Sequence, residues 1–134
     1  MCYLQYLVFQ VLLLYQKENE LFTQNLIKMI VEVNSENYEE IVLQTDKPVL
    51  LDFYATWCGP CKILHSTLEK LAEEFKDTAV IAKVNVEENT DITVLYGIKV
   101  LPTVMFVNKQ ERTDNKIVGV RPINEYSDIL KELI

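Results

Sequence analysis

The sequence predicts one α/β domain preceded by an apolar segment. Short β-type runs alternate with segments whose apolar residues recur every three or four positions, the pattern of strands alternating with helices. The chain has 134 residues, of which 49% are hydrophobic, enough for one domain with one core. Neither repeats nor low-complexity linkers divide it. We therefore expect one domain over residues 29–134 and an N-terminal extension over residues 1–28.

The extension begins with an uncharged, mostly apolar stretch over residues 1–16. A secretory signal would need a basic start and a small-residue cleavage site, and neither is present. A membrane span needs about 20 apolar residues, and Gln5 and Gln10 interrupt this shorter run. We expect a helical extension that packs on another surface, or sequence upstream of a start at Met29. A membrane anchor and a secretory signal stay open as alternatives.

The first half of the domain predicts strand, helix, strand and helix. A β-type run covers residues 29–33, and Asn34 or Ser35 can cap a helix after it. Residues 49–54 are almost continuously apolar, which is typical of a strand covered on both faces. The helix that follows, to about Phe75, has one apolar stripe at steps of four, three and four.

The second half begins with another buried strand over residues 80–86. A short helix can start at Asn89 or Thr90 and end near Gly97, which suits the left-handed position after a helix. The order so far is strand and helix in alternation.

The last part of the chain predicts two strands and a helix. The strands cover residues 103–107 and 116–120, and polar residues 108–115 join them. An amphipathic helix started by Pro122 or Asn124 ends the chain. The full order is β-α-β-α-β-α-β-β-α, which favours one compact α/β domain.

Two cysteines, Cys58 and Cys61, stand three positions apart where a strand meets a helix. If Cys58 is the N-cap, Gly59 and Pro60 fill the first helical positions and the Cys58 sulfur accepts a hydrogen bond from the Cys61 backbone N–H. The helix dipole favours a thiolate at this end. Residues three apart in a first turn lie about 5–6 Å apart at Cα, within the range for a disulfide. The spacing therefore predicts a redox-active dithiol.

Two other interpretations of the cysteine pair remain. A zinc site could recruit Cys58, Cys61 and His65, but these fall along one helix and only the remote Cys2 could be a fourth ligand. A static structural bridge would be poorly placed in a reducing compartment. Three cysteines are too few for a secreted disulfide scaffold, so the usage indicates a cytosolic redox protein.

The net charge of −7 argues against nucleic acid and anionic membranes as partners. The pI near 4.7 points the same way.

Several stretches resemble the thioredoxin family: residues 51–62, 82–84, 96–103 and 118–119. The resemblance covers residues 29–134, and Cys-Gly-Pro-Cys is its most specific element. It implies a thioredoxin fold, with a central mixed β-sheet of about five strands flanked by about four helices. The Gly-Pro pair between the cysteines implies a reducing member of the family.

The resemblance also implies roles for residues around the dithiol. Cys58 would be the exposed attacking thiol and Cys61 the partly buried resolving thiol, with Gly59 and Pro60 between them. Asp52 matches the family's buried acid beneath the dithiol; burial raises the pKa of such a carboxyl, so that it can accept the Cys61 proton. Lys83 matches the lysine near this acid.

A second set of residues would bind the substrate. Trp57 would supply an apolar wall beside the dithiol. Pro102 resembles the family's cis-proline, and the preceding Leu101 keeps its N–H and C=O free for an extended substrate segment. Gly119 would allow the substrate to approach closely.

The chain departs from the family pattern at several positions. Ser66 stands where a helix-kinking proline is frequent, and Tyr54 replaces a frequent tryptophan. Val100 replaces a usually small residue, which bears on the shape of the substrate groove. The turn over residues 108–115 lacks the usual glycine. We expect His65 to be a solvated helix residue without a catalytic role.

Together these features predict a cytoplasmic, monomeric protein disulfide reductase. Its partners would be disulfide-containing target proteins and a flavin-dependent thioredoxin reductase, and the domain would need no metal or bound cofactor. One alternative is an oxidase or isomerase in an oxidising compartment, delivered there by residues 1–28. The other is a non-catalytic binding module in a larger assembly.

Overall fold

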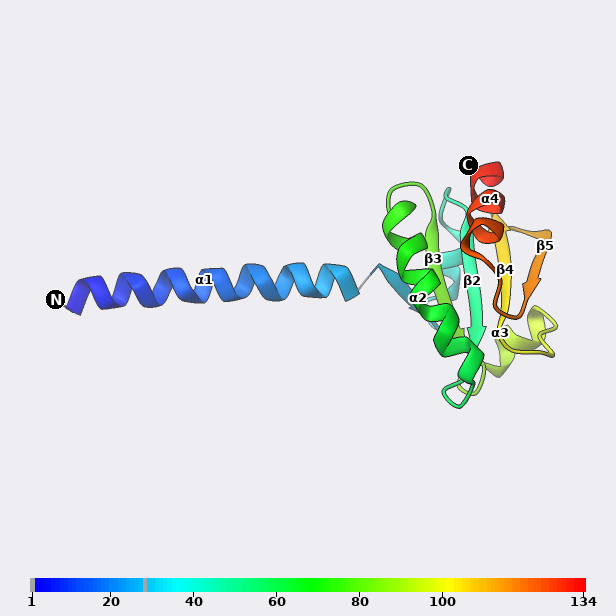
Figure 1. Ribbon diagram of the computed structural model, residues 1–134, viewed down its shortest axis with the longest axis horizontal. Coiled ribbons are helices and arrows are strands. Elements are labelled where there is room, and N and C mark those ends of the chain that lie inside the picture. Colours follow the sequence, from blue (N-terminus) through cyan, green and yellow to red (C-terminus); the bar gives the residue numbers. More distant parts are fainter. Residues whose placement is uncertain (1, 28) are drawn as a thin grey trace.

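A mixed sheet of five strands forms the centre of the domain that follows α1 (Cys2–Ile27), the N-terminal helix (Figure 1). The computed structural model describes residues 2–27 and 29–134. The strand order is β1-β3-β2-β4-β5, in which β1, β3 and β2 are parallel and β4 and β5 are antiparallel to their neighbours. The strands are β1 (Ile30–Val33), β2 (Val49–Tyr54), β3 (Val80–Asn85), β4 (Thr103–Asn108) and β5 (Glu111–Val118). The expected α/β fold with its mixed five-stranded sheet is confirmed.

Helices cover both faces of this sheet (Figure 1). On one face α2 (Gly59–Glu74) and α4 (Ile123–Leu133) pack against a core that includes Leu50, Ile81 and Phe106. On the other face α3 (Thr90–Leu95) and the π-helical turn η1 (Glu39–Leu43) enclose a second core. The stripe of leucines expected along residues 64–75 is the buried face of α2.

Side chains alternate between the two faces of β2, and this alternation decides on which face Asp52 lies. Leu50 belongs to the core beneath α2, whereas Leu51 and Phe53 belong to the opposite core. Because side chains alternate along a strand, Asp52 shares the face of Leu50. Asp52 therefore lies under the start of α2, where Cys61 is also placed.

The segment between β1 and β2 differs from the expected helix. It forms the single turn η1, in which the Gln44 N–H donates to the Glu39 carbonyl five residues back. Asn34 caps the turns before η1, since its Oδ1 accepts from the backbone N–H of Glu36 at 2.9 Å and of Asn37 at 3.0 Å. The prediction that Asn34 or Ser35 caps the helix is wrong for η1, whose N-cap is Tyr38 without a side-chain hydrogen bond, and the helix is only one turn long.

The prediction of a loop over residues 108–115 is wrong. The strands meet in a tight turn at Lys109 and Gln110, which have φ values of 50° and 72°. Residues 111–115 belong to β5, an edge strand whose side chains there are mostly exposed. An exposed edge strand tolerates polar residues, so its sequence resembles a loop. β5 also ends at Val118 rather than at residue 120.

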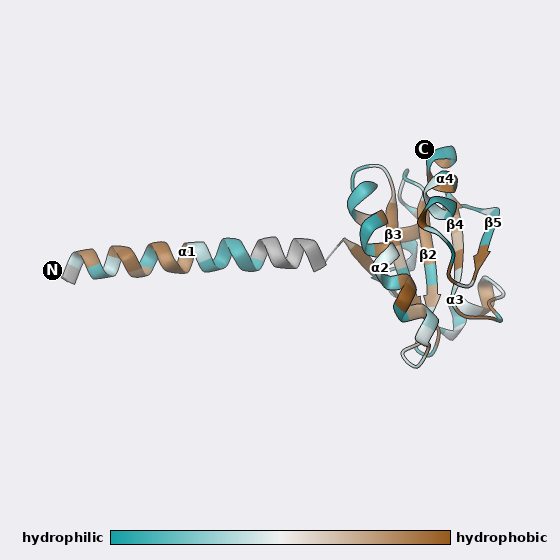
Figure 2. Ribbon diagram, viewed as in Figure 1, coloured by the Kyte–Doolittle hydropathy of each residue, from teal (hydrophilic) through white to brown (hydrophobic). Residues whose placement is uncertain are grey.

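The N-terminal extension forms the helix α1 (Cys2–Ile27), as expected (Figure 1). The side chains of residues 3–20 are exposed, and the apolar ones gather in the first half of the helix (Figure 2). Within residues 2–27 and 29–134, no helix is both long and apolar enough to cross a membrane.

Candidate active site

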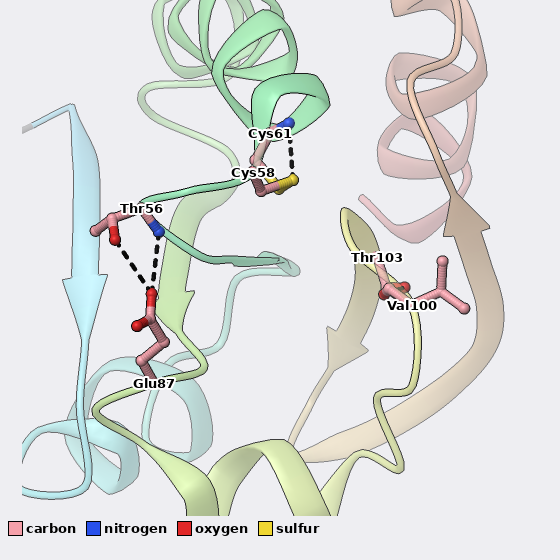
Figure 3. Close-up of a disulfide and its surroundings, with 6 residues drawn as sticks. All are labelled: Thr56, Cys58, Cys61, Glu87, Val100 and Thr103. Carbon is pink, nitrogen blue, oxygen red and sulfur yellow. Dashed lines mark hydrogen bonds between the residues drawn. A yellow bond between two sulfur atoms is a disulfide. The ribbon is translucent and has the colours of Figure 1, made fainter.

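A disulfide between Cys58 and Cys61 lies at the N-terminus of α2 (Figure 3). Cys58 is the N-cap, and its Sγ accepts a hydrogen bond from the Cys61 backbone N–H at 3.3 Å. The two Cα atoms are 5.3 Å apart. The local geometry expected from the spacing is confirmed, with Gly59 and Pro60 in the first turn, where backbone N–H groups have no helical partner.

Cys58 is less accessible than expected. Cys58 and Cys61 are each 5% exposed and pack against Ala55, so the expectation of an exposed Cys58 is wrong for this oxidised form. The Cys58 sulfur is bonded to Cys61 and accepts the Cys61 N–H, so it lies against the first turn of α2. The two cysteines nevertheless line different pockets. Cys58 faces a groove of about 450 Å³, and Cys61 faces a pocket of about 310 Å³.

The groove beside Cys58 carries the side chains expected to bind substrate. Trp57, which is 71% exposed, and Leu101 both line this groove. The Leu101–Pro102 peptide bond is cis, as expected. No hydrogen bond from the described residues reaches the backbone N–H or C=O of Leu101. This segment can therefore offer both groups to an extended peptide.

Gly119 supports the loop that carries the cis-proline. Its N–H donates to the Pro102 carbonyl at 2.9 Å, and its φ of +79° is in the region that favours glycine. Gly119 does not line the groove beside Cys58.

Val100 also lies outside the lining of that groove. Its side chain is 56% exposed, and its carbonyl accepts a hydrogen bond from Thr103 Oγ1 at 2.6 Å (Figure 3). The bulk of Val100 is therefore presented to solvent next to the groove, where it does not narrow the passage to Cys58.

Asp52 lies in the second pocket, together with Cys61, Lys83 and His65. It is 2% exposed, and its Oδ1 is buried without a hydrogen-bond partner. Burial raises the pKa of Asp52 from its ordinary value of 3.8 to about 7, while Lys83 lowers it and Glu32 raises it. A carboxyl with such a pKa can take up and release a proton near neutral pH.

Lys83 is the neighbour of Asp52 on the adjacent strand, but its ammonium pairs elsewhere. The registers place Lys83 opposite Asp52 on β2 and opposite Glu32 on β1. The Lys83 Nζ lies 3.4 Å from Glu32 Oε2, and it stands 5.1 Å from the centre of the Tyr54 ring. Tyr54 in turn donates to Glu32 Oε1 at 2.6 Å. Sequence reasoning did not identify Glu32, because only the strand register reveals it.

The loop before Cys58 is held by another residue that sequence reasoning missed. Glu87 accepts hydrogen bonds from the Thr56 backbone N–H at 3.3 Å and from Thr56 Oγ1 at 3.1 Å (Figure 3). Glu87 stands two residues after the end of β3, so the segment after one strand supports the loop after another. No local pattern signals this contact, since the residues are 31 positions apart.

Two remaining residues of α2 have local roles. His65 is half-buried, and its Nε2 lies 3.2 Å from Glu69 Oε1 one turn along the helix. Ser66 donates to the Ile63 carbonyl at 3.0 Å, and α2 runs without interruption from Gly59 to Glu74.

Comparison with known proteins points to one family. The family model for thioredoxin matches residues 29–132. The chain is 39% identical over 103 residues to a thioredoxin of Chlorobaculum thiosulfatiphilum, covering 77% of this chain and 94% of that protein. It is 37% identical over 106 residues to a thioredoxin of Rickettsia felis, covering 79% of this chain and 100% of that protein. It is 51% identical over 69 residues to Thioredoxin-T of Drosophila melanogaster, covering 52% of this chain and 44% of that protein.

Proposed function

This chain belongs to the thioredoxin family of thiol–disulfide oxidoreductases, and we propose that within it the chain acts as a protein disulfide reductase. The observation that carries this proposal is the disulfide at the tip of α2, beside a groove with unpaired backbone groups. A groove of this kind suits a peptide segment better than a small molecule, because a strand-like segment can pair with Leu101.

The proposed reaction is thiol–disulfide exchange. The Cys58 thiolate attacks one sulfur of a target disulfide, and the other target sulfur leaves as a thiol after taking up a proton. The Cys61 thiol then loses its proton to Asp52 and attacks Cys58 in the mixed disulfide. The second target sulfur leaves, and the Cys58–Cys61 bond forms. Two electrons pass from the dithiol to the target.

Each element of the site has a part in this cycle. The α2 dipole and the N–H of Cys61 stabilise the Cys58 thiolate before attack. Trp57 and Leu101 hold the target segment against the groove. Asp52 and the nearby Lys83 line the pocket on the Cys61 side, where the proton is transferred.

The amino-acid sequence supports the assignment of the domain bounds, the recycling partner, the oligomeric state and the compartment. Residues 29–134 form the catalytic domain, and residues 1–28 form an extension that does not enter the reaction. The oxidised domain is reduced again by a flavin-dependent thioredoxin reductase. We propose that it works as a monomer in the cytoplasm without a metal or bound cofactor.

Serine variants of the two cysteines test the assignment of roles. Cys58→Ser should lower the reduction of a protein disulfide to the background rate, because the attacking sulfur is lost. Cys61→Ser should accumulate a mixed disulfide with the target, because the resolving sulfur is lost. Mass spectrometry of the trapped adduct and a turnover assay measure the two outcomes.

The matched control is Cys2→Ser, which changes the third cysteine and should leave the rate unchanged. Reduction by Cys58→Ser at the rate of the unchanged protein would contradict the proposed roles. Faster oxidation of a reduced dithiol than reduction of a disulfide would instead place the chain among oxidising members of the fold.

A further inference from the structure

Three charged residues form a row across the parallel half of the sheet. The registers place Glu32 of β1 opposite Lys83 of β3, and Lys83 opposite Asp52 of β2. Neighbouring strands are about 4.8 Å apart, so the Cα of Lys83 lies at similar distances from the Cα atoms of Glu32 and Asp52. Lys83 therefore has two acidic neighbours and can pair with either.

The ammonium of Lys83 is with Glu32. The Nζ–Oε2 distance is 3.4 Å, whereas Asp52 makes no ion pair or hydrogen bond with any described residue. The phenol of Tyr54 holds the other oxygen of Glu32 at 2.6 Å, and its ring lies beneath the ammonium at 5.1 Å. Glu32 and Tyr54 thus bind Lys83 from two directions.

We infer that Glu32 is a positioning residue, which draws Lys83 away from Asp52 and so keeps that carboxyl able to gain and lose a proton beside Cys61. Glu32 does not touch the reacting sulfur atoms and does not line the pocket that holds Cys61. Its effect passes through Lys83. The catalytic consequence rests on the proposed function, whereas the effect on the protonation of Asp52 does not.

The expected direction follows from the charges. A lysine ammonium that moves toward Asp52 favours its carboxylate and lowers its pKa. Loss of the negative charge of Glu32 lowers this pKa as well, because Glu32 raises it at present. A carboxylate with a lower pKa is a weaker base. Asp52 would then bind the proton of Cys61 more weakly.

The other groups around Asp52 do not replace Glu32 in this role. From β4 the register partner is the apolar Val104. His65 is paired with Glu69, and Tyr126 of α4 donates to the Gly119 carbonyl. The titratable and charged residues that face Asp52 from the packed elements are Glu32, Tyr54, Cys61, Lys62, His65, Lys83 and Tyr126.

Carboxyl NMR of the oxidised, full-length chain tests the inference directly. In the unchanged protein the Asp52 carboxyl should titrate near pH 7. Glu32→Gln should lower this midpoint by roughly one pH unit, since an opposite charge brought within about 4–6 Å has an effect of that size. Glu32→Asp keeps the negative charge, so the Asp52 titration midpoint of this variant should stay close to that of the unchanged protein.

Two further variants separate positioning from a general charge effect. Glu74→Gln removes a carboxylate paired with Lys131 at 3.9 Å and should leave the midpoint unchanged. In a Lys83→Gln background, Glu32→Gln should produce a clearly smaller shift, because the intermediary is absent. An unchanged or raised midpoint in Glu32→Gln would overturn the inference, and so would an equal shift with and without Lys83.

A kinetic readout keeps the inference distinct from the proposed function. The rate at which Cys61 resolves a preformed mixed disulfide is followed against pH. Its acidic limb should move down in Glu32→Gln by the same amount as the NMR midpoint. A shifted NMR midpoint with an unchanged pH profile would support the role of Glu32 and overturn Asp52 as the proton acceptor.

Discussion

Asp52 shows how a single residue couples the chemistry of the site to the stability of the fold. It is a carboxyl beneath α2, and its Oδ1 has no hydrogen-bond partner among the described residues. Burying a carboxylate without a partner is unfavourable, so the folded protein favours the protonated form. The raised pKa that would let Asp52 accept a proton near neutral pH also makes the ionised carboxylate unfavourable in the folded protein.

Asp52→Asn should therefore stabilise the protein at high pH. The pKa of Asp52 is raised from 3.8 in the unfolded chain to about 7 in the folded protein. Stability from the bound proton is present below about pH 4 and is lost as the pH rises through 7. The variant should raise the free energy of unfolding at pH 8 by up to about 4 kcal/mol, and much less at pH 4.

Urea unfolding at the two pH values measures this difference. Asp77→Asn, at an exposed position, is the matched control and should change stability by no more than about 0.5 kcal/mol. An equal gain for Asp52→Asn at pH 4 and pH 8 would show that the effect has another origin than the titration of this carboxyl.

Among the elements, the N-terminus of α2 and the β4–β5 hairpin differ in how well their residue types suit the local backbone conformation. The first turn of α2 has a residue suited to each position, from the Cys58 cap to Pro60. The hairpin instead places Lys109 and Gln110 at positive φ, where a side chain is unfavourable by about 1–2 kcal/mol. At the start of α2 the residue types match the backbone conformation, whereas at the turn between β4 and β5 they do not.

Gln110→Gly should stabilise the hairpin. At a φ of 72° glycine removes the steric penalty of the side chain, and this exceeds its greater loss of backbone freedom on folding. We expect a gain of about 0.5–1 kcal/mol in the free energy of unfolding, measured by chemical denaturation. Glu111→Gly, one residue along within β5, should have the opposite sign. A loss of stability in Gln110→Gly would contradict the strain at this turn.

At the scale of the whole molecule, α1 and the sheet domain differ in how they bury apolar surface. The three clusters of buried side chains in the described part of the chain consist of residues from 29 onward. The apolar residues of the first half of α1 are exposed, including Leu4, Phe9 and Leu14. The thioredoxin match begins at residue 29 as well.

Removal of residues 1–28 should leave the domain folded and active. The melting temperature should change by less than about 2 °C, because the described side chains of α1 are exposed and contribute little burial to the domain. Calorimetry and a disulfide-reduction assay on residues 29–134 measure this. A large drop in melting temperature would show that α1 is part of the folding unit.

Features that depend only on neighbouring residues could be predicted from the amino-acid sequence. Cys58, Gly59, Pro60 and Cys61 are consecutive, so the capped disulfide follows from the geometry of one helical turn. The strand β2 and the buried stripe of α2 follow from the period of their apolar residues. These predictions required no knowledge of which strands are adjacent.

Features that join distant parts of the chain could not be predicted without the folded structure. The row of Glu32, Lys83 and Asp52 depends on the registers of three parallel strands, which local sequence does not specify. The burial of Cys58 depends on its bonding and packing in the folded site. The first part of edge strand β5, residues 111–115, was predicted as a loop because an exposed edge strand needs few apolar residues. In each case the physical reason is that the contact partner is set by the packing of the sheet and not by position along the chain.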